Sequence, residues 1–187
     1  MKKLATLFAL IIALSSMGQS KKISGVTLPG KLKLGESELI LNGGEVREKY
    51  WIDLYVGGLY LESKSSNGKT IIAANKPMAI KLHIVSSLID SETMIDAVND
   101  GFERATEGNT KPIQAEIDQL IKIFSEPIKD NDEYILGYIP GKGVEVLKNG
   151  KSAGVIEGFA FKKALFSIWL GDEPASSDLK KGMLGAD

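Results

Sequence analysis

The alternation of apolar and polar residues predicts strands in the first half of the chain. Lys31–Leu34 alternates strictly, as a half-buried strand does. The run from Val46 to Leu61 is much longer, and we expect it to form one extended strand. Counting by twos places Arg47, Trp51 and Tyr55 on the same face of this run. That face mixes one charge with aromatic rings, which is typical of a pocket wall or a wet sheet face.

One glycine pair precedes this run, and a second pair lies within it. Asn42-Gly43-Gly44 precedes it and predicts a tight turn, because these residues tolerate positive φ. Gly57-Gly58 lies inside the run and predicts a β-bulge. Strict alternation would point Tyr60 away from Tyr55, and a bulge would turn Tyr60 onto the face of Arg47.

Helical periodicity is found in later stretches. Ser91 is a candidate N-cap for a first helix, whose apolar residues recur at helical spacing through Phe102. Pro112 stands where a second helix would begin. A third helix is expected over Phe159–Leu170, and a short last helix within residues 174–184.

Three short strands are expected between the second and third helices, at Glu133–Ile139, Gly143–Leu147 and Ala153–Ile156. The Asn149-Gly150 pair between the last two is typical of a hairpin turn. Strands and helices are segregated along the chain rather than alternating. This order predicts an α+β fold with a large, mainly antiparallel sheet. No internal repeat and no long linker divides the chain into further domains.

The first twenty residues differ in character from the rest. Lys2 and Lys3 precede an apolar segment, Leu4–Leu14, and small residues follow it. This order predicts a secretory signal peptide over residues 1–20, and the apolar segment is short for a membrane anchor. A mature domain of residues 21–187 would then be secreted, to the periplasm in a bacterium, with no transmembrane segment left after cleavage.

Composition excludes several classes of function. The net charge of -1 offers no basic excess for nucleic acid. The chain has no cysteine, so thiol catalysis, disulfides and thiolate metal sites are excluded. The single histidine, His83, argues against a histidine-rich metal site, and its position on a strand is more typical of a solvent-facing or hydrogen-bonded residue. The sequence therefore indicates neither a metal nor a cofactor.

Arg47 is the candidate binding residue. A strand arginine among aromatic rings can hold a carboxylate or a phenolate through charge-assisted, bidentate hydrogen bonds. Trp51, Tyr55 and Tyr60 are its candidate partners at the site. The plainer alternative is an exposed arginine that pairs with a neighbouring glutamate.

The stretch Gly43–Glu62 resembles the chalcone isomerase-like superfamily, which includes plant chalcone isomerases, plastid fatty-acid-binding proteins and secreted bacterial relatives. The similarity lies in Arg47 and in Tyr55-Val56-Gly57-Gly58-Leu59-Tyr60. It continues in Gly154-Val155-Ile156-Glu157 and in Trp169-Leu170-Gly171-Asp172, so it covers nearly all of the mature chain. The resemblance implies an open-faced β-sandwich, in which helices pack over one face of a large antiparallel sheet and leave a cleft.

The resemblance also implies a role for Arg47, as the cationic group of that cleft. In the fatty-acid-binding branch this arginine holds the acyl carboxylate with a tyrosine, for which Tyr55 and Tyr60 are both candidates. In the isomerases it stabilises a phenolate, and Tyr60 or Tyr55 would be the proton donor. The polar residues that shape the isomerase site are substituted here, and Asp90 stands where a tyrosine is expected.

These observations favour a protein without catalytic activity that binds a fatty acid or a similar apolar anion through Arg47. Two alternatives stay open at this stage. One is an intramolecular lyase that closes the ring of a chalcone. The other is an interaction protein of the cell envelope that has no ligand, for which we expect a cleft filled by side chains.

Overall fold

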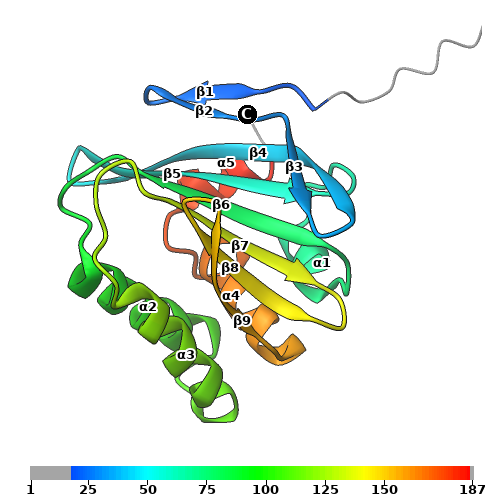
Figure 1. The fold of residues 1–187 in the computed structure, drawn as a ribbon, viewed down its shortest axis with the longest axis vertical. Helices are drawn as coiled ribbons and strands as arrows, with labels where there is room; N and C mark the ends of the chain where they lie inside the picture. The colour runs from blue at the N-terminus through cyan, green and yellow to red at the C-terminus, as the bar shows by residue number, and fades with distance from the viewer. Residues whose placement is uncertain (1–17, 186–187) are drawn as a thin grey trace, which may run out of the picture.

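The computed structural model describes residues 18–185, so the predicted signal peptide, residues 1–20, lies almost wholly outside the described part of the chain. Seven strands form one antiparallel sheet, and each strand pairs with its neighbours in chain order (Figure 1). The strands are β3 (Lys31–Leu34), β4 (Ser37–Lys49), β5 (Ile52–Leu61), β6 (Met78–Ile84), β7 (Glu133–Ile139), β8 (Gly143–Lys148) and β9 (Lys151–Ile156). A separate hairpin of β1 (Lys21–Ile23) and β2 (Val26–Leu28) precedes them.

The helices pack on one face of this sheet, which confirms the predicted α+β class and the open-faced sandwich (Figure 1). They are α1 (Gly68–Ala73), α2 (Ser91–Ala105), the 3-10 turn η1 (Lys111–Ile113), α3 (Gln114–Phe124), α4 (Phe159–Leu170) and α5 (Ser177–Met183). Within the described residues, none of these helices is long and apolar enough to cross a membrane.

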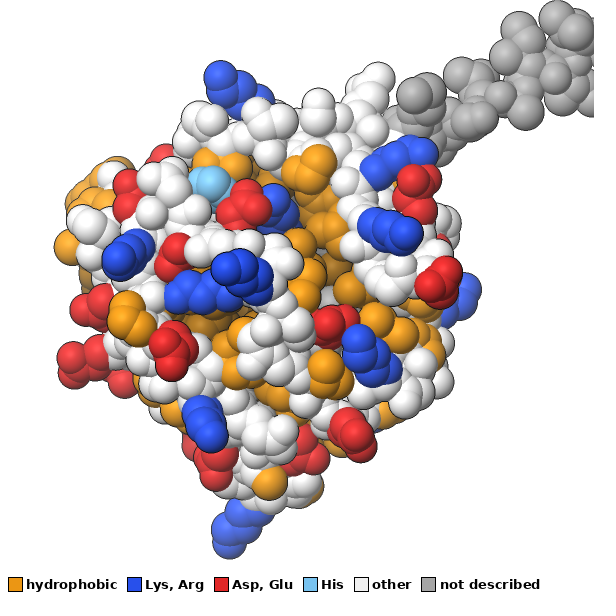
Figure 2. Space-filling model, viewed as in Figure 1, with side chains coloured by type: hydrophobic (Ala, Val, Ile, Leu, Met, Phe, Trp, Pro, Cys, Tyr) orange, Lys and Arg blue, Asp and Glu red, His pale blue; other side chains and the backbone are white. Residues whose placement is uncertain are grey.

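The sheet has a hydrophobic core on each side. The helix face of the sheet packs against side chains of α2, α3 and α4, such as Phe102, Phe124 and Phe161. The outer face packs Val56 and Tyr60 against residues of the β1–β2 hairpin and β3. A hollow in this outer face exposes hydrophobic side chains (Figure 2). Because successive residues of a strand point to opposite faces, every site residue can be assigned to one face.

The run from Val46 to Leu61 is a hairpin, so the prediction of one extended strand was wrong. β4 ends at Lys49, β5 begins at Ile52, and these two residues pair across the turn. The turn residues Tyr50 and Trp51 have φ of 52° and 61°, as a two-residue type I′ turn requires. The alternation of apolar and polar residues continues through so short a turn. Aromatic residues in place of Asn-Gly leave no turn signal in the sequence.

The glycine pairs allow close packing and form neither the predicted turn nor the predicted bulge. Gly43 and Gly44 lie inside β4, and Gly57 pairs regularly with β6, as do its neighbours. A Cβ on Gly43 would collide with the carbonyl oxygen of Gly182 in α5, and one on Gly57 would lie 2.6 Å from Met183 Cε. The missing side chains therefore let α5 lie directly on the sheet.

The β4–β5 register shifts in two places, between Arg47 and Glu48 and at Asn42. The buried Asn42 amide donates to the carbonyl oxygens of Ser65 and Met183, at 2.9 and 2.8 Å. Its side-chain oxygen accepts from the Ser65 amide at 2.8 Å. The bulged residue thus fastens the end of α5 to the loop that follows β5.

The N-cap of α2 is Asp90, one residue before the predicted Ser91. The Asp90 carboxylate accepts from the Thr93 amide at 2.8 Å, and the Thr93 hydroxyl accepts from the Asp90 amide at 2.9 Å. These reciprocal bonds form a capping box. The hydrogen bonds from the Thr93 amide and hydroxyl lower the pKa of Asp90. Asp90 therefore has a structural role where the resemblance to the isomerases led us to expect a tyrosine.

Lys162 is fully buried in α4. Its ammonium donates to the carbonyl oxygens of Ile72 and Ala74, both at 2.8 Å, and of Ile71 at 3.2 Å. These carbonyls belong to the end of α1, which a cation there stabilises. Burial lowers the pKa of Lys162 to about 8. This lysine ties α4 to α1 at the end of the sheet.

Replacing Gly43 by alanine tests the close packing of α5. We expect the Gly43→Ala protein to lose about 1–3 kcal/mol of unfolding free energy, as overpacked sites do, because the new methyl group meets backbone atoms of α5. Urea unfolding gives the measurement, with Ser152→Ala on the exposed side of β9 as the control. A loss equal to that of the control would show that α5 does not press on Gly43.

Candidate functional site

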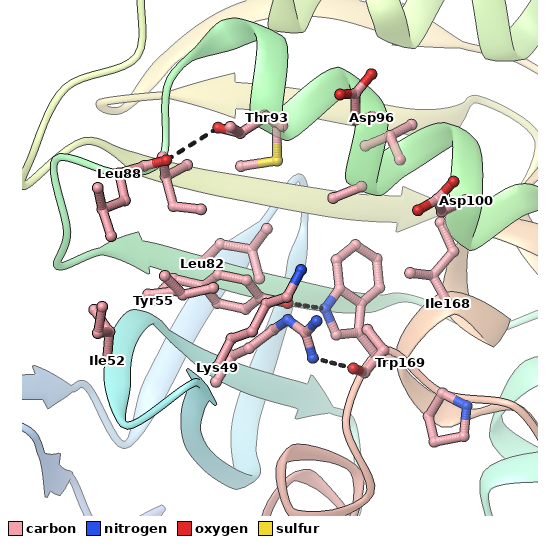
Figure 3. A pocket seen from close by; sticks show the side chains of 18 of the residues that line it. Lys49, Ile52, Tyr55, Leu82, Leu88, Thr93, Asp96, Asp100, Ile168 and Trp169 are labelled. Atoms are coloured by element: carbon pink, nitrogen blue, oxygen red, sulfur yellow. Dashed lines mark hydrogen bonds between the residues drawn. The ribbon is translucent and has the colours of Figure 1, made fainter.

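A cleft of about 800 Å³ opens between the sheet and the helices at the end where the β4–β5 hairpin turns. β4, β5 and β6 form one wall, α2 forms the opposite wall, and α4 with the α4–α5 connection closes the end (Figure 3). Most of the lining is apolar. Its aliphatic and thioether side chains include Leu54, Leu82, Ile89, Met94, Val98 and Ile168. A cleft of this size is typical of a small-molecule site.

Arg47 reaches this cleft from β4. It pairs across the strands with Tyr55 of β5, so the two side chains lie on the same face, the helix face. The half-buried guanidinium donates through Nη1 to the carbonyl oxygen of Ala175, in the α4–α5 connection. Among the described residues it forms no salt bridge with an acidic side chain. The alternative in which Arg47 pairs with a neighbouring glutamate is therefore not what the structure contains.

Tyr55 lies next to Arg47 and is held by a helix residue. Its hydroxyl oxygen accepts a hydrogen bond from the indole nitrogen of Trp169, at 3.0 Å. The side chain is only 7% exposed. Burial raises the pKa of Tyr55, although the nearby Arg47 charge and the Trp169 bond act in the opposite direction. The hydroxyl therefore keeps its proton at neutral pH and can donate it to an anion bound at Arg47.

Charged side chains flank the apolar part of the cleft. Lys49 projects from the sheet wall into the space below α2, whereas Asp96 and Asp100 lie on α2 itself (Figure 3). Both aspartates are exposed and water can solvate them. The positive charges of the cleft are Arg47 and Lys49 on the sheet wall and the exposed Arg104 near the end of α2. Arg47 is the one of these that is partly removed from water and lies next to a buried hydrogen-bond donor.

Tyr60 does not reach this cleft. It lies on the outer face of the sheet, where its buried hydroxyl donates to the carbonyl oxygen of Pro29 at 3.0 Å. Burial, with the nearby Glu133 charge, raises the pKa of Tyr60. The bulge that would have brought Tyr60 to Arg47 is contradicted by the regular pairing of Gly57 with Leu82. Of the two candidate tyrosines, only Tyr55 lies beside Arg47.

Trp51 also lies outside the cleft lining. It is 90% exposed at the second position of the β4–β5 turn. Its neighbour Tyr50 lines the cleft mouth instead. The predicted set of Arg47, Trp51, Tyr55 and Tyr60 is thus divided among the cleft, the turn and the opposite face.

Sequence reasoning missed Trp169 and Ala175 as neighbours of Arg47. The sequence placed Trp169 only within the helix expected over Phe159–Leu170, and its indole nitrogen gave no sign of a partner 114 residues earlier in the chain. Ala175 contributes a backbone carbonyl, which carries no signal in a side-chain pattern. The sequence contained one signal for Trp169, because the stretch Trp169-Leu170-Gly171-Asp172 is part of the family resemblance.

His83 lies on the outer face of the sheet, outside the cleft lining. Its Nδ1 is 3.1 Å from a carboxylate oxygen of Glu133, which also accepts from Lys81 at 2.8 Å. It is thus a hydrogen-bonded strand histidine, one of the two expectations for it. Among the described residues, no group of three histidine or acidic side chains is arranged to hold a metal ion.

The family model of chalcone isomerase-like proteins matches residues 20–185. The chain therefore belongs to the chalcone isomerase-like family, as the sequence resemblance indicated. Among solved structures, the fatty-acid binding protein AtFAP1 of Arabidopsis thaliana aligns with a TM-score of 0.68 and 18% sequence identity. The alignment covers 86% of this chain and 92% of that one, and at this identity it establishes a shared fold. No curated protein sequence matches the chain.

Proposed function

We propose that this protein binds a fatty acid or a similar apolar anion, with the anionic group at Arg47 and the chain in the cleft below α2. The observation that carries the proposal is Arg47 itself. It is a half-buried guanidinium with no acidic partner among the described residues, and it lies beside a buried tyrosine hydroxyl in an apolar cleft. The similarity to a fatty-acid binding protein of the same fold adds support.

The geometry suits a carboxylate. Arg47 uses one nitrogen for the Ala175 carbonyl, which leaves further guanidinium N–H groups for an anion. Tyr55 has its oxygen occupied by Trp169, so its proton is free to donate. Hydrogen bonds to a charged group contribute about 1.5–3 kcal/mol each. The alkyl chain contributes roughly 0.8 kcal/mol per buried methylene, so Arg47 has mainly to orient the ligand.

The two alternative functions receive less support from the site. An isomerase mechanism with Tyr60 as proton donor has no counterpart here, because Tyr60 lies on the outer face. Of the two tyrosines considered as proton donors, Tyr55 is the one that lies beside Arg47. The ligand-free interaction protein was expected to have a cleft filled by side chains, whereas the space between sheet and α2 measures about 800 Å³.

Lipid carried through purification tests the proposal. We expect the wild-type protein, extracted with organic solvent, to release fatty acid in a near-stoichiometric amount by mass spectrometry. Arg47→Ala should release at least about tenfold less, the equivalent of one lost charge-assisted bond. Lys33→Ala, which removes a positive charge from the exposed edge of the sheet, serves as the control and should carry as much as wild type.

Equal trace amounts of lipid in wild type and Arg47→Ala would reject the proposal. The thermal unfolding of both proteins is recorded alongside, so that loss of lipid is read only from folded protein. Arg47→Lys adds a further comparison, since lysine keeps the charge but not the bidentate geometry. We expect it to carry an intermediate amount.

We further propose that the protein acts outside the cytoplasm, after residues 1–20 are removed. The basic start, the short apolar segment and the small residues that follow support this. Expression of the full chain in a bacterium with two membranes should place the protein in the periplasmic fraction. Its intact mass should correspond to a chain that begins near residue 21. A variant that starts at Lys21 is the control and should stay in the cytoplasm. Recovery of the full chain from the cytoplasm with its uncleaved mass would contradict the proposal.

A further inference from the structure

The mouth of the cleft has an exposed apolar rim. Its members are large hydrophobic side chains that water contacts freely: Tyr50 (79% exposed), Trp51 (90%), Ile52 (43%) and Leu88 (55%). The first three form the β4–β5 turn and the start of β5, and Leu88 lies in the loop between β6 and α2. We call these four residues the aromatic rim. Hydrophobic side chains gather at the left edge of the molecule in Figure 2, where this turn and this loop lie in Figure 1.

The turn holds its aromatic residues in an unfavourable backbone conformation. Both Tyr50 and Trp51 have positive φ, a region that non-glycine residues rarely adopt and that hairpins usually fill with Asn-Gly. Burial of the rings does not offset this cost, because both rings are exposed. Unfavourable backbone at an exposed position is typical of functional sites. Both rings therefore face solvent from a turn with unfavourable backbone.

The aromatic rim continues into the cleft. Tyr50, Ile52 and Leu88 are lining residues of the cleft as well as exposed ones, and Ile52 and Leu88 lie on opposite walls at the same end of it (Figure 3). These residues therefore extend apolar surface from the outside of the molecule to the lining of the cleft. A partner that covers the rim would also cover the opening.

The charges around the rim are of both signs, with more acidic than basic side chains. Lys49 lies over the Tyr50 ring, with Nζ 5.6 Å from the ring centroid, and Arg47 is on the same face. Glu48 and Asp53 are cross-strand neighbours, and their side chains lie on the other face of the hairpin. The start of α2, next to Leu88, adds Asp90 and Glu92. A strongly anionic partner would meet this acidic excess and a cationic one would meet Lys49 over the Tyr50 ring, whereas a neutral, amphipathic surface suits both the mixed charges and the exposed rings.

We propose that the aromatic rim docks on the surface of a zwitterionic phospholipid bilayer, with Trp51 inserted at the headgroup level. Tryptophan, tyrosine and lysine are the side chains that favour this interface, because each joins an apolar body to a polar end. The docked rim would open the cleft onto the bilayer, so that an amphiphilic ligand passes between them without crossing water. This last step rests on the proposed function, whereas the docking does not.

Replacing Trp51 by glycine gives a direct test. Glycine suits the positive φ of this position, so the Trp51→Gly protein should unfold at an equal or higher temperature than wild type. Trp51 is outside the cleft lining, so the affinity for a fluorescent fatty acid in water should not change. Flotation with phosphatidylcholine vesicles should show at least about tenfold weaker partitioning, because one large apolar side chain no longer enters the bilayer.

A matched control removes a similar exposed apolar group elsewhere. Val155 on β9 is 38% exposed and lies away from the cleft, and Val155→Thr should float with vesicles as wild type does. In the wild-type protein, vesicles should also shift the emission of Trp51 to shorter wavelength, and lipids brominated near the headgroup should quench it. Transfer of the fluorescent fatty acid to vesicles should be slower from Trp51→Gly than from wild type.

Several outcomes would overturn the docking. One is wild-type protein that stays off phosphatidylcholine vesicles or binds only anionic phosphatidylglycerol vesicles. Another is Trp51→Gly protein that floats as well as wild type. A third is a dimer seen by light scattering that Trp51→Gly abolishes, which would assign the rim to a second copy of the chain. If vesicles bind but no fatty acid does, the proposed function fails and the docking stands.

Discussion

The site depends on the close approach of α5 to the sheet at Gly43 and Gly57. Because neither residue carries a Cβ, the backbone and side chains of α5 lie directly on β4 and β5. This position fixes the connection that precedes α5, and that connection brings the Ala175 carbonyl to Arg47. The other constraint is the antiparallel pairing of Arg47 with Tyr55, which places both on the helix face. The close packing of α5 on the two glycines therefore helps to position the Arg47 guanidinium at the cleft.

Much of the fold could be predicted from the sequence, because it follows from local patterns. Period-two alternation located β3, and helical spacing located α2. The three short strands expected after the second helix are β7 to β9, Asn149-Gly150 located the β8–β9 turn, and the helix expected over Phe159–Leu170 is α4. The segregation of strands and helices indicated the class. Within the site, Arg47 and Tyr55 were expected on one face, and the structure brings them together. The strand and helix positions follow from local spacing, whereas Arg47 and Tyr55 share a face as members of two paired strands and not of the single strand that was expected.

The remainder depends on interactions between distant parts of the chain. The turn at Tyr50 and Trp51 escaped prediction because its residues favour strands, and tertiary pairing overrides that preference. A separate expectation, the bulge at Gly57-Gly58, kept Tyr60 as a candidate partner of Arg47, whereas its hydroxyl donates to the carbonyl oxygen of Pro29 on the outer face. Trp169 is 114 residues from its partner Tyr55. Lys162 caps a helix 88 residues earlier, and no local pattern distinguishes it from a solvated lysine.

The central claim is that the negative charge of the ligand, and not only its apolar chain, is held by Arg47. The direct measurement is isothermal titration of the wild-type protein with a long-chain fatty acid and with its methyl ester, which keeps the chain and removes the charge. The account predicts that the ester binds about 10- to 100-fold more weakly to wild type, and that Arg47→Ala reduces this ratio to near one. Equal affinities of wild type for acid and ester would contradict it.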